Sequence, residues 1–286
     1  MFWAFVLTLV FMGLELVGGI LAHSMALLAD AGHMLTDAAA LAMAWAAIRL
    51  ANRPADPRRS FGYRRLQVLA TFVNGFSLLA VVLWIVFESC QRLLNPEPVH
   101  AKLMLVVALI GAAANILVFS LLRHGRADMN VAAAALHVLS DLLGSGAAIV
   151  ASVVIMETNW TPVDPLLSLL VSALIVRSAW SLVRKSTHIL MEGAPDWLDV
   201  GELRRQLQSK VPAIVDIHHV HCWSLAPEET MLTMHALIVN GADPAATLRE
   251  TNRVLAANYG INHATIQLER EVCAEQECRK FIAGHP

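Results

Sequence analysis

The chain has 286 residues, of which 57% are hydrophobic and only 15% are charged. A soluble domain usually carries about a quarter charged residues, so most of this chain is not built for water. Its formal net charge of −2 gives no overall attraction to nucleic acid, and four scattered cysteines exclude a disulfide-rich scaffold.

Six apolar segments follow one another along the first two thirds of the chain. A bilayer core of about 30 Å needs roughly 20 apolar residues per helix. The segments that meet this length are expected at residues 2–21, 24–50, 66–93, 101–122, 130–156 and 163–182. Proline, glycine and charged residues mark the breaks between them. The sequence therefore predicts an α-helical membrane protein with six transmembrane helices.

The placement of Lys and Arg predicts which side of the membrane each connection occupies, because cytosolic loops carry an excess of basic residues. The connections after the second, fourth and sixth spans hold ten: Arg49, Arg53, Arg58, Arg59, Arg64, Arg65, Arg123, Arg126, Arg184 and Lys185. The opposite connections hold Arg92 and Lys102. Both termini are therefore expected in the cytosol.

The residues after 187 have a mixed polar and apolar composition and contain no further span. The predicted elements are a helix at 198–210, strands at 214–225 and 230–240, a helix at 244–259 and a strand at 263–270. Asp199 is the expected N-cap of the first helix, and Asp243 precedes Pro244 at the start of the second. This predicts a cytosolic α+β domain of ferredoxin-like type at 188–286, after a transmembrane domain at 1–187.

Two of the spans carry the same pair of ionisable residues, His33 with Asp37 and His137 with Asp141. In each pair the residues are four apart, so both side chains project from one helix face. Placing an ionisable side chain at mid-span costs about 2.5–3.5 kcal/mol of free energy. Such residues are therefore expected to have a function. A single buried pair is commonly structural, but its repetition in two spans favours a shared site.

The depth of the two pairs supports this interpretation. At ~1.5 Å per residue, the first lies roughly 16 Å from the outer surface and the second roughly 12 Å from the inner one. Both are therefore near the midplane, where alternating-access transporters hold substrate. Two imidazole nitrogens and two carboxylate oxygens suit tetrahedral Zn²⁺.

The cytosolic segment contains a second group of candidate ligands. They are His218, His219, His221, Cys222, His235, His263, Glu269, Cys273 and Cys278. Alternation along a strand places His219 and His221 on one face and His218 on the other. Cys273 and Cys278 are five apart, wider than a tight zinc knuckle. They are equally compatible with a second metal site and with inert thiols.

At the paired His and Asp residues the sequence resembles the cation diffusion facilitator family, especially its bacterial zinc exporter branch. The matching stretches are 28–37 (LADAGHMLTD), 60–63 (SFGY), 135–145 (ALHVLSDLLGS), 190–195 (LMEGAP) and 218–223 (HHVHCW). The resemblance covers nearly the whole chain. It implies a homodimer in the bacterial inner membrane that exchanges cytosolic Zn²⁺ for protons, with a metallochaperone-like cytosolic domain.

The resemblance also implies which residues bind metal. His33, Asp37, His137 and Asp141 fall on the family's transport-site positions, and His218, His221, His235, His263 and Glu269 fall on its cytosolic ligand positions. The alternation argument separates His218 from His221 unless a β-bulge lies between them. Tyr63 stands where some members carry a histidine ligand, so no metal site is expected in that loop.

The expected mechanism is exchange of Zn²⁺ for protons. Metal ligands must be deprotonated, and histidine, with a reference pKa of about 6.5, trades metal for protons near neutral pH. A passive channel, a membrane-anchored sensor and an intramembrane metalloenzyme are the alternatives. An enzyme is disfavoured because four protein ligands leave no open position on the metal, and no His-Glu-x-x-His motif occurs.

Overall fold

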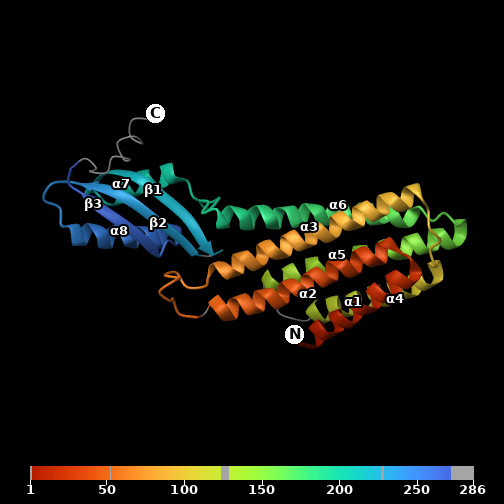
Figure 1. Ribbon diagram of the computed structural model, residues 1–286. Coiled ribbons are helices and arrows are strands. Elements are labelled where there is room, and N and C mark those ends of the chain that lie inside the picture. Colours follow the sequence, from red (N-terminus) through yellow and green to blue (C-terminus); the bar gives the residue numbers. More distant parts are fainter. Residues whose placement is uncertain (1, 52, 124–128, 227–228, 272–286) are drawn as a thin grey trace. The chain divides into compact units, whose positions relative to one another are not determined.

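The computed structural model of the chain describes residues 2–51, 53–123, 129–226 and 229–271 (Figure 1). The chain forms two compact units. The first contains residues 1–47 and 70–184, and the second contains residues 48–69 and 185–286. The short connection between the second and third helices is thus grouped with the C-terminal segment.

Six long helices make up the first unit, and some of their ends belong to the second unit. They are α1 (Phe2–Ala22), α2 (Met25–Ala51), α3 (Arg65–Leu94), α4 (Ala101–Arg123), α5 (Met129–Thr158) and α6 (Val163–Leu190). Each predicted apolar segment is confirmed as a helix. The prediction ended the sixth near residue 182, but α6 continues to Leu190 because Arg184 and Lys185 interrupt the apolar run without disfavouring helix.

Small residues allow the helices of the first unit to pack closely. Ala26 of α2, Ala108 of α4 and Ala148 of α5 are all buried in one cluster, and such residues let helix backbones approach each other in a membrane. Leu78 of α3 and Ile175 of α6 belong to a separate cluster.

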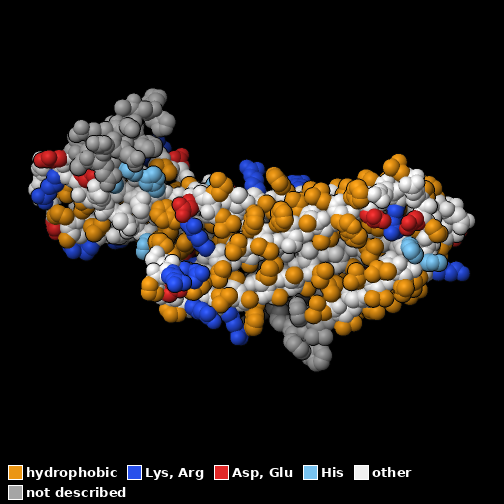
Figure 2. All heavy atoms as spheres, in the orientation of Figure 1, with side chains coloured by type: hydrophobic (Ala, Val, Ile, Leu, Met, Phe, Trp, Pro, Cys, Tyr) orange, Lys and Arg blue, Asp and Glu red, His pale blue; other side chains and the backbone are white. Residues whose placement is uncertain are grey.

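The surface of this bundle is apolar, as Figure 2 shows along the length of the helices. Val17, Phe76, Phe87 and Leu170 are each more than half exposed. Continuous apolar surface of this kind is rare on soluble monomers. Within the described residues, α3, α6 and the Asp141–Thr158 part of α5 are long and apolar enough to cross a membrane. The helices are those of an integral membrane protein.

The C-terminal segment folds as α7 (Val200–Lys210), β1 (Ile214–Ala226), β2 (Glu229–Ile238), α8 (Pro244–Tyr259) and β3 (His263–Glu269). The strand order is β1-β2-β3, with β1 antiparallel and β3 parallel to β2. Asp199 caps α7 through the backbone N–H groups of Gly201 and Glu202, and Asp243 caps α8 through that of Ala245. Both predicted caps are confirmed.

The core of this small domain lies on one face of its sheet. Leu232, Met234, Ala236 and Ile238 alternate along β2 and are buried against α7 and α8, through residues such as Leu207 and Leu255. The intervening positions of β2, which include His235, occupy the opposite face.

Candidate metal centres

Helices α2 and α5 bring together one residue from each of the two predicted pairs. His33 Nε2 lies 3.8 Å from Asp141 Oδ1, and the two side chains are 14% and 9% exposed. This distance is too long for a hydrogen bond. Two ligands at about 2.0 Å from one tetrahedral Zn²⁺ stand roughly 3.3 Å apart. The observed separation is therefore compatible with both atoms binding one ion.

A second contact shows how α2 and α5 run past each other. Ser145 Oγ donates a hydrogen bond to Asp30 Oδ2 at 3.1 Å. A Cβ added to Gly144 would stand 2.5 Å from Asp30 Oδ1, so glycine at this position leaves room for the Asp30 carboxylate. Residues 30 and 33 of α2 lie against residues 145 and 141 of α5, which is an antiparallel arrangement.

The other two predicted ligands, Asp37 and His137, lie in the helical parts of α2 and α5. Their side chains are outside the described part of the structure. Their backbone positions continue the same two faces by one turn, since Asp37 follows His33 by four residues and His137 precedes Asp141 by four.

Two further carboxylates are buried near Asp141. Glu15 of α1 is 1% exposed and Asp30 is 3% exposed. Each interacts electrostatically with Asp141. For Asp30, the hydrogen bond from Ser145 shows that it connects α2 to α5.

The start of α2 is held by Asp164 of α6, a residue that the sequence analysis did not single out. Its carboxylate accepts hydrogen bonds from Ser24 Oγ at 2.7 Å, from Met25 N at 2.6 Å and from Ala26 N at 3.2 Å. Asp164 is fully buried. Since the first N–H groups of a helix have no partner within it, Asp164 serves as a cap from another helix and helps to position α2.

In the small domain, a β-bulge resolves the conflict over His218 and His221. His218 pairs with His235 and His221 pairs with Thr233, with a register shift between them. His219 is the bulged residue and has φ of 51°. Two residues on β1 therefore oppose one on β2, and the bulge returns His221 to the face of His218. The separation predicted from simple alternation is wrong.

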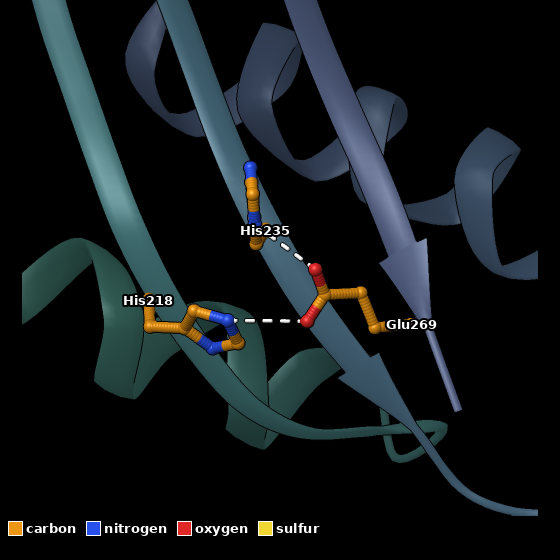
Figure 3. Close-up of side chains that lie close together, drawn as sticks. All are labelled: His218, His235 and Glu269. Atoms are coloured by element: carbon orange, nitrogen blue, oxygen red, sulfur yellow. Dashed lines mark ion pairs between the residues drawn. The ribbon is translucent and has the colours of Figure 1, made fainter. Parts of the chain in front are cut away.

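Three side chains on this face form a compact group (Figure 3). Glu269 lies between the two imidazoles, with Oε2 at 3.2 Å from His218 Nε2 and Oε1 at 3.0 Å from His235 Nδ1. One ligand atom from each residue lies within 4.8 Å of the others. His218 Nδ1 also lies 3.2 Å from Asp216 Oδ2, a carboxylate contact of the kind that orients metal-binding histidines.

The remaining predicted ligands are placed differently. The ring of His219 is 4.7 Å from that of His221 and 4.8 Å from that of His235, so His221 lies at the edge of the group. His263 opens β3 while Glu269 closes it, and six residues of strand span about 20 Å. His263 therefore does not join Glu269 in one site; its ring lies 6.1 Å from Phe61.

The cysteines add no ligand within the described residues. Cys222 is buried, and burial raises the pKa of its thiol to about 11, which disfavours the thiolate that a metal requires. Cys273 and Cys278 lie outside the described residues.

Comparison with known proteins gives the class to which this chain belongs. Residues 1–191 match the cation efflux transmembrane domain, and residues 195–271 match the cytoplasmic domain of cation efflux proteins. The chain belongs to this family of membrane transporters, also called cation diffusion facilitators.

Several curated relatives match almost the whole chain. The zinc transporter ZitB of Pectobacterium atrosepticum is 49% identical over 99% of this chain and 88% of its own length. ZitB of Escherichia coli is 46% identical, covering 99% and 91%. The metal cation efflux system protein CzcD of Cupriavidus metallidurans is 36% identical, covering 99% and 90%. The solved metal-bound C-terminal domain of CzcD is 30% identical over 25% of this chain and 99% of that structure, with a TM-score of 0.24.

Proposed function

We propose that this protein exports Zn²⁺ from the cytosol in exchange for protons, through a site formed by His33, Asp37, His137 and Asp141. The observation that carries the proposal is the 3.8 Å approach of His33 to Asp141 between α2 and α5. Because these helices run antiparallel, the next turn of the same two faces brings Asp37 toward His137. Two carboxylates and two neutral imidazoles then balance one divalent cation.

The topology proposed for transport has six spans, α1 to α6, with both termini in the cytosol. In this topology, residues 1–187 form the transport domain and residues 188–286 form a ferredoxin-like metal-binding domain. The basic residues of the α2–α3 connection support this orientation. The curated relatives named zinc transporters support zinc as the substrate.

Proton exchange follows from the chemistry of the ligands. Zn²⁺ binds imidazole nitrogens that carry no proton and carboxylates that are ionised. Protons arriving from the outer side compete for the same atoms and release Zn²⁺ outward. The protonated carrier then turns inward and loses its protons to the cytosol. An inward proton gradient thereby drives zinc outward by alternating access.

Transport by the purified full-length chain in proteoliposomes tests this proposal. With a zinc-sensitive dye in the lumen, an acidic lumen is expected to accelerate zinc entry several-fold over symmetric pH, and nigericin is expected to abolish the acceleration. Protein-dependent zinc entry at the same rate with and without the pH gradient would identify a passive channel and refute the exchanger.

We further propose that the cytosolic domain binds Zn²⁺ through His218, His235 and Glu269, within a homodimer. The three ligand atoms lie close enough to hold one ion, and the mixed nitrogen and oxygen donors suit zinc. Binding there would make the domain a sensor of cytosolic zinc. The residues of this face, rather than the buried Cys222, provide the ligands.

Substituting Glu269→Ala is expected to weaken zinc binding to this domain about 10- to 100-fold, because it removes the ligand that lies between both imidazoles. The measurement is zinc titration of the full-length protein against a chelating dye, with Asp141→Ala present to silence the membrane site. The matched control is Glu250→Gln, whose carboxylate pairs with Arg253 on α8. Equal affinities in the Glu269 and Glu250 variants would contradict the site.

A further inference from the structure

The connection between α2 and α3 is strongly basic. Residues 48–69 contain six arginines and a single acidic residue, Asp56. Figure 2 shows Lys and Arg side chains gathered where the ends of these two helices are joined. Neither the proposed transport site nor the cytosolic ligand group uses these residues.

The only acidic side chain of this connection accepts hydrogen bonds from residues of the turn that contains it. Asp56 Oδ1 accepts hydrogen bonds from the backbone N–H groups of Arg58 at 2.8 Å and Arg59 at 2.9 Å. Its Oδ2 accepts one from Tyr63 Oη at 2.9 Å. The Arg59 guanidinium donates to Tyr63 Oη at 2.9 Å and lies 4.6 Å from the centre of the Tyr63 ring. These contacts hold the turn in a defined shape.

The same turn forms one side of a pocket of about 520 Å³ that lies wholly within the second unit. Its basic side chains are Arg58, Arg59 and Arg65. Arg65 Nη2 donates to Glu192 Oε1 at 2.8 Å. Arg58 is exposed, and no carboxylate of the described residues forms an ion pair with its side chain. The pocket therefore presents an uncompensated guanidinium group.

Ser60 and Glu192 also line the pocket, and its remaining walls are mainly apolar. They are provided by Leu66 and Leu69 of α3, Leu190 of α6, and Trp223 and Leu225 of β1. The pocket thus combines a cationic rim with a hydrocarbon-like surface. A ligand that satisfies both must have an anionic group next to an apolar chain.

The sequence positions of these walls show where such a ligand would come from. Leu66 and Leu69 are in the first turns of α3, and Leu190 is the last residue of α6. Both helices are long and apolar enough to cross a membrane, so their ends lie at the level of the lipid headgroups. In the topology of the proposed function, on which this step rests, that level is the cytosolic leaflet, whose lipids carry negative charge.

We propose that this pocket binds an anionic phospholipid, with its phosphate on Arg58 and Arg59 and the start of an acyl chain against Leu66 and Leu69. Guanidinium groups bind phosphate with paired hydrogen bonds. Free inorganic phosphate shares that headgroup chemistry but has no apolar part, so it is not expected to bind with comparable affinity.

The test is native mass spectrometry of the full-length protein in detergent, titrated with phosphatidylglycerol, phosphatidylcholine or inorganic phosphate. A preference for phosphatidylglycerol is expected in the unmodified chain. A basic residue near a membrane surface contributes roughly five-fold in affinity. Arg58→Gln should therefore weaken phosphatidylglycerol binding about five-fold, and Arg58→Gln with Arg59→Gln roughly 30-fold.

Arg249→Gln is the matched control, since it removes an exposed arginine of α8 that does not line the pocket. The Arg58→Gln variant is expected to fold normally, because the side chain of Arg58 takes no part in the contacts among Asp56, Arg59 and Tyr63. Equal weakening by Arg249→Gln, equal binding of phosphatidylcholine, or full displacement by millimolar phosphate would each overturn the proposal. The assay contains no zinc gradient, so its failure is distinguishable from failure of the exporter.

Discussion

Asp141→Ala is expected to lower zinc transport about 100-fold while the protein remains folded. Complete zinc sites bind with apparent free energies of about 10–16 kcal/mol, so one of four ligands accounts for roughly 3 kcal/mol, or about 100-fold in affinity. The Asp141 side chain is 9% exposed and its carboxylate faces His33, so water is poorly placed to replace it. The measurement is zinc entry into proteoliposomes under an imposed pH gradient.

Two comparisons show whether a loss of transport arises from the proposed site. Asp141→Asn keeps the size of the side chain but removes its charge, and it should transport nearly as poorly as the alanine variant. Glu250→Gln on α8 removes a carboxylate far along the sequence and should transport normally. Undiminished zinc-driven proton flux in Asp141→Ala would remove this residue from the transport site.

Asp164→Ala is expected to produce the largest loss of stability. It leaves the Ser24 hydroxyl and the backbone N–H groups of Met25 and Ala26 without their acceptor at a fully buried position. Each hydrogen bond to a charged group contributes about 1.5–3 kcal/mol, so a loss of roughly 3–5 kcal/mol is expected. This corresponds to a decrease of the melting temperature on the order of 10 °C, measured on purified protein in detergent.

Asp199→Ala is the control for this prediction, because Asp199 also caps a helix but is exposed. Its side chain accepts from Gly201 N at 2.7 Å and Glu202 N at 3.1 Å. Loss of an exposed cap costs ~1 kcal/mol, so the melting temperature should fall by only a few degrees. If Asp164→Ala and Asp199→Ala melt at the same temperature, the buried carboxylate does not anchor α2.

The sequence was most informative where local composition reflects the surrounding solvent. An apolar run long enough for a bilayer is visible without any partner, and the helix bounds agree with the predicted segments to within a few residues except at the end of α6. The caps at Asp199 and Asp243 were predictable for a similar reason. Their hydrogen bonds are made within three residues.

The candidate sites were only partly predictable. The four-residue spacing of His33 with Asp37 and of His137 with Asp141 places each pair on one helix face, which is a property of any helix. The contact between α2 and α5 depends on Gly144 and on the hydrogen bond from Ser145 to Asp30. In the cytosolic domain, the alternation argument was wrong because a strand sequence does not reveal where a bulge inserts an extra residue.

By itself, the sequence determined which segments are apolar, where the helices and strands lie, and that each His and Asp pair shares one helix face, because these depend on periodicity and composition over about 20 residues. Only the tertiary structure decided that Asp164 caps a helix about 140 residues away in the chain, and that Glu269, not His263, lies with His218 and His235. Those pairings arise from packing and strand register, in which residues distant in sequence meet, and no local pattern encodes them.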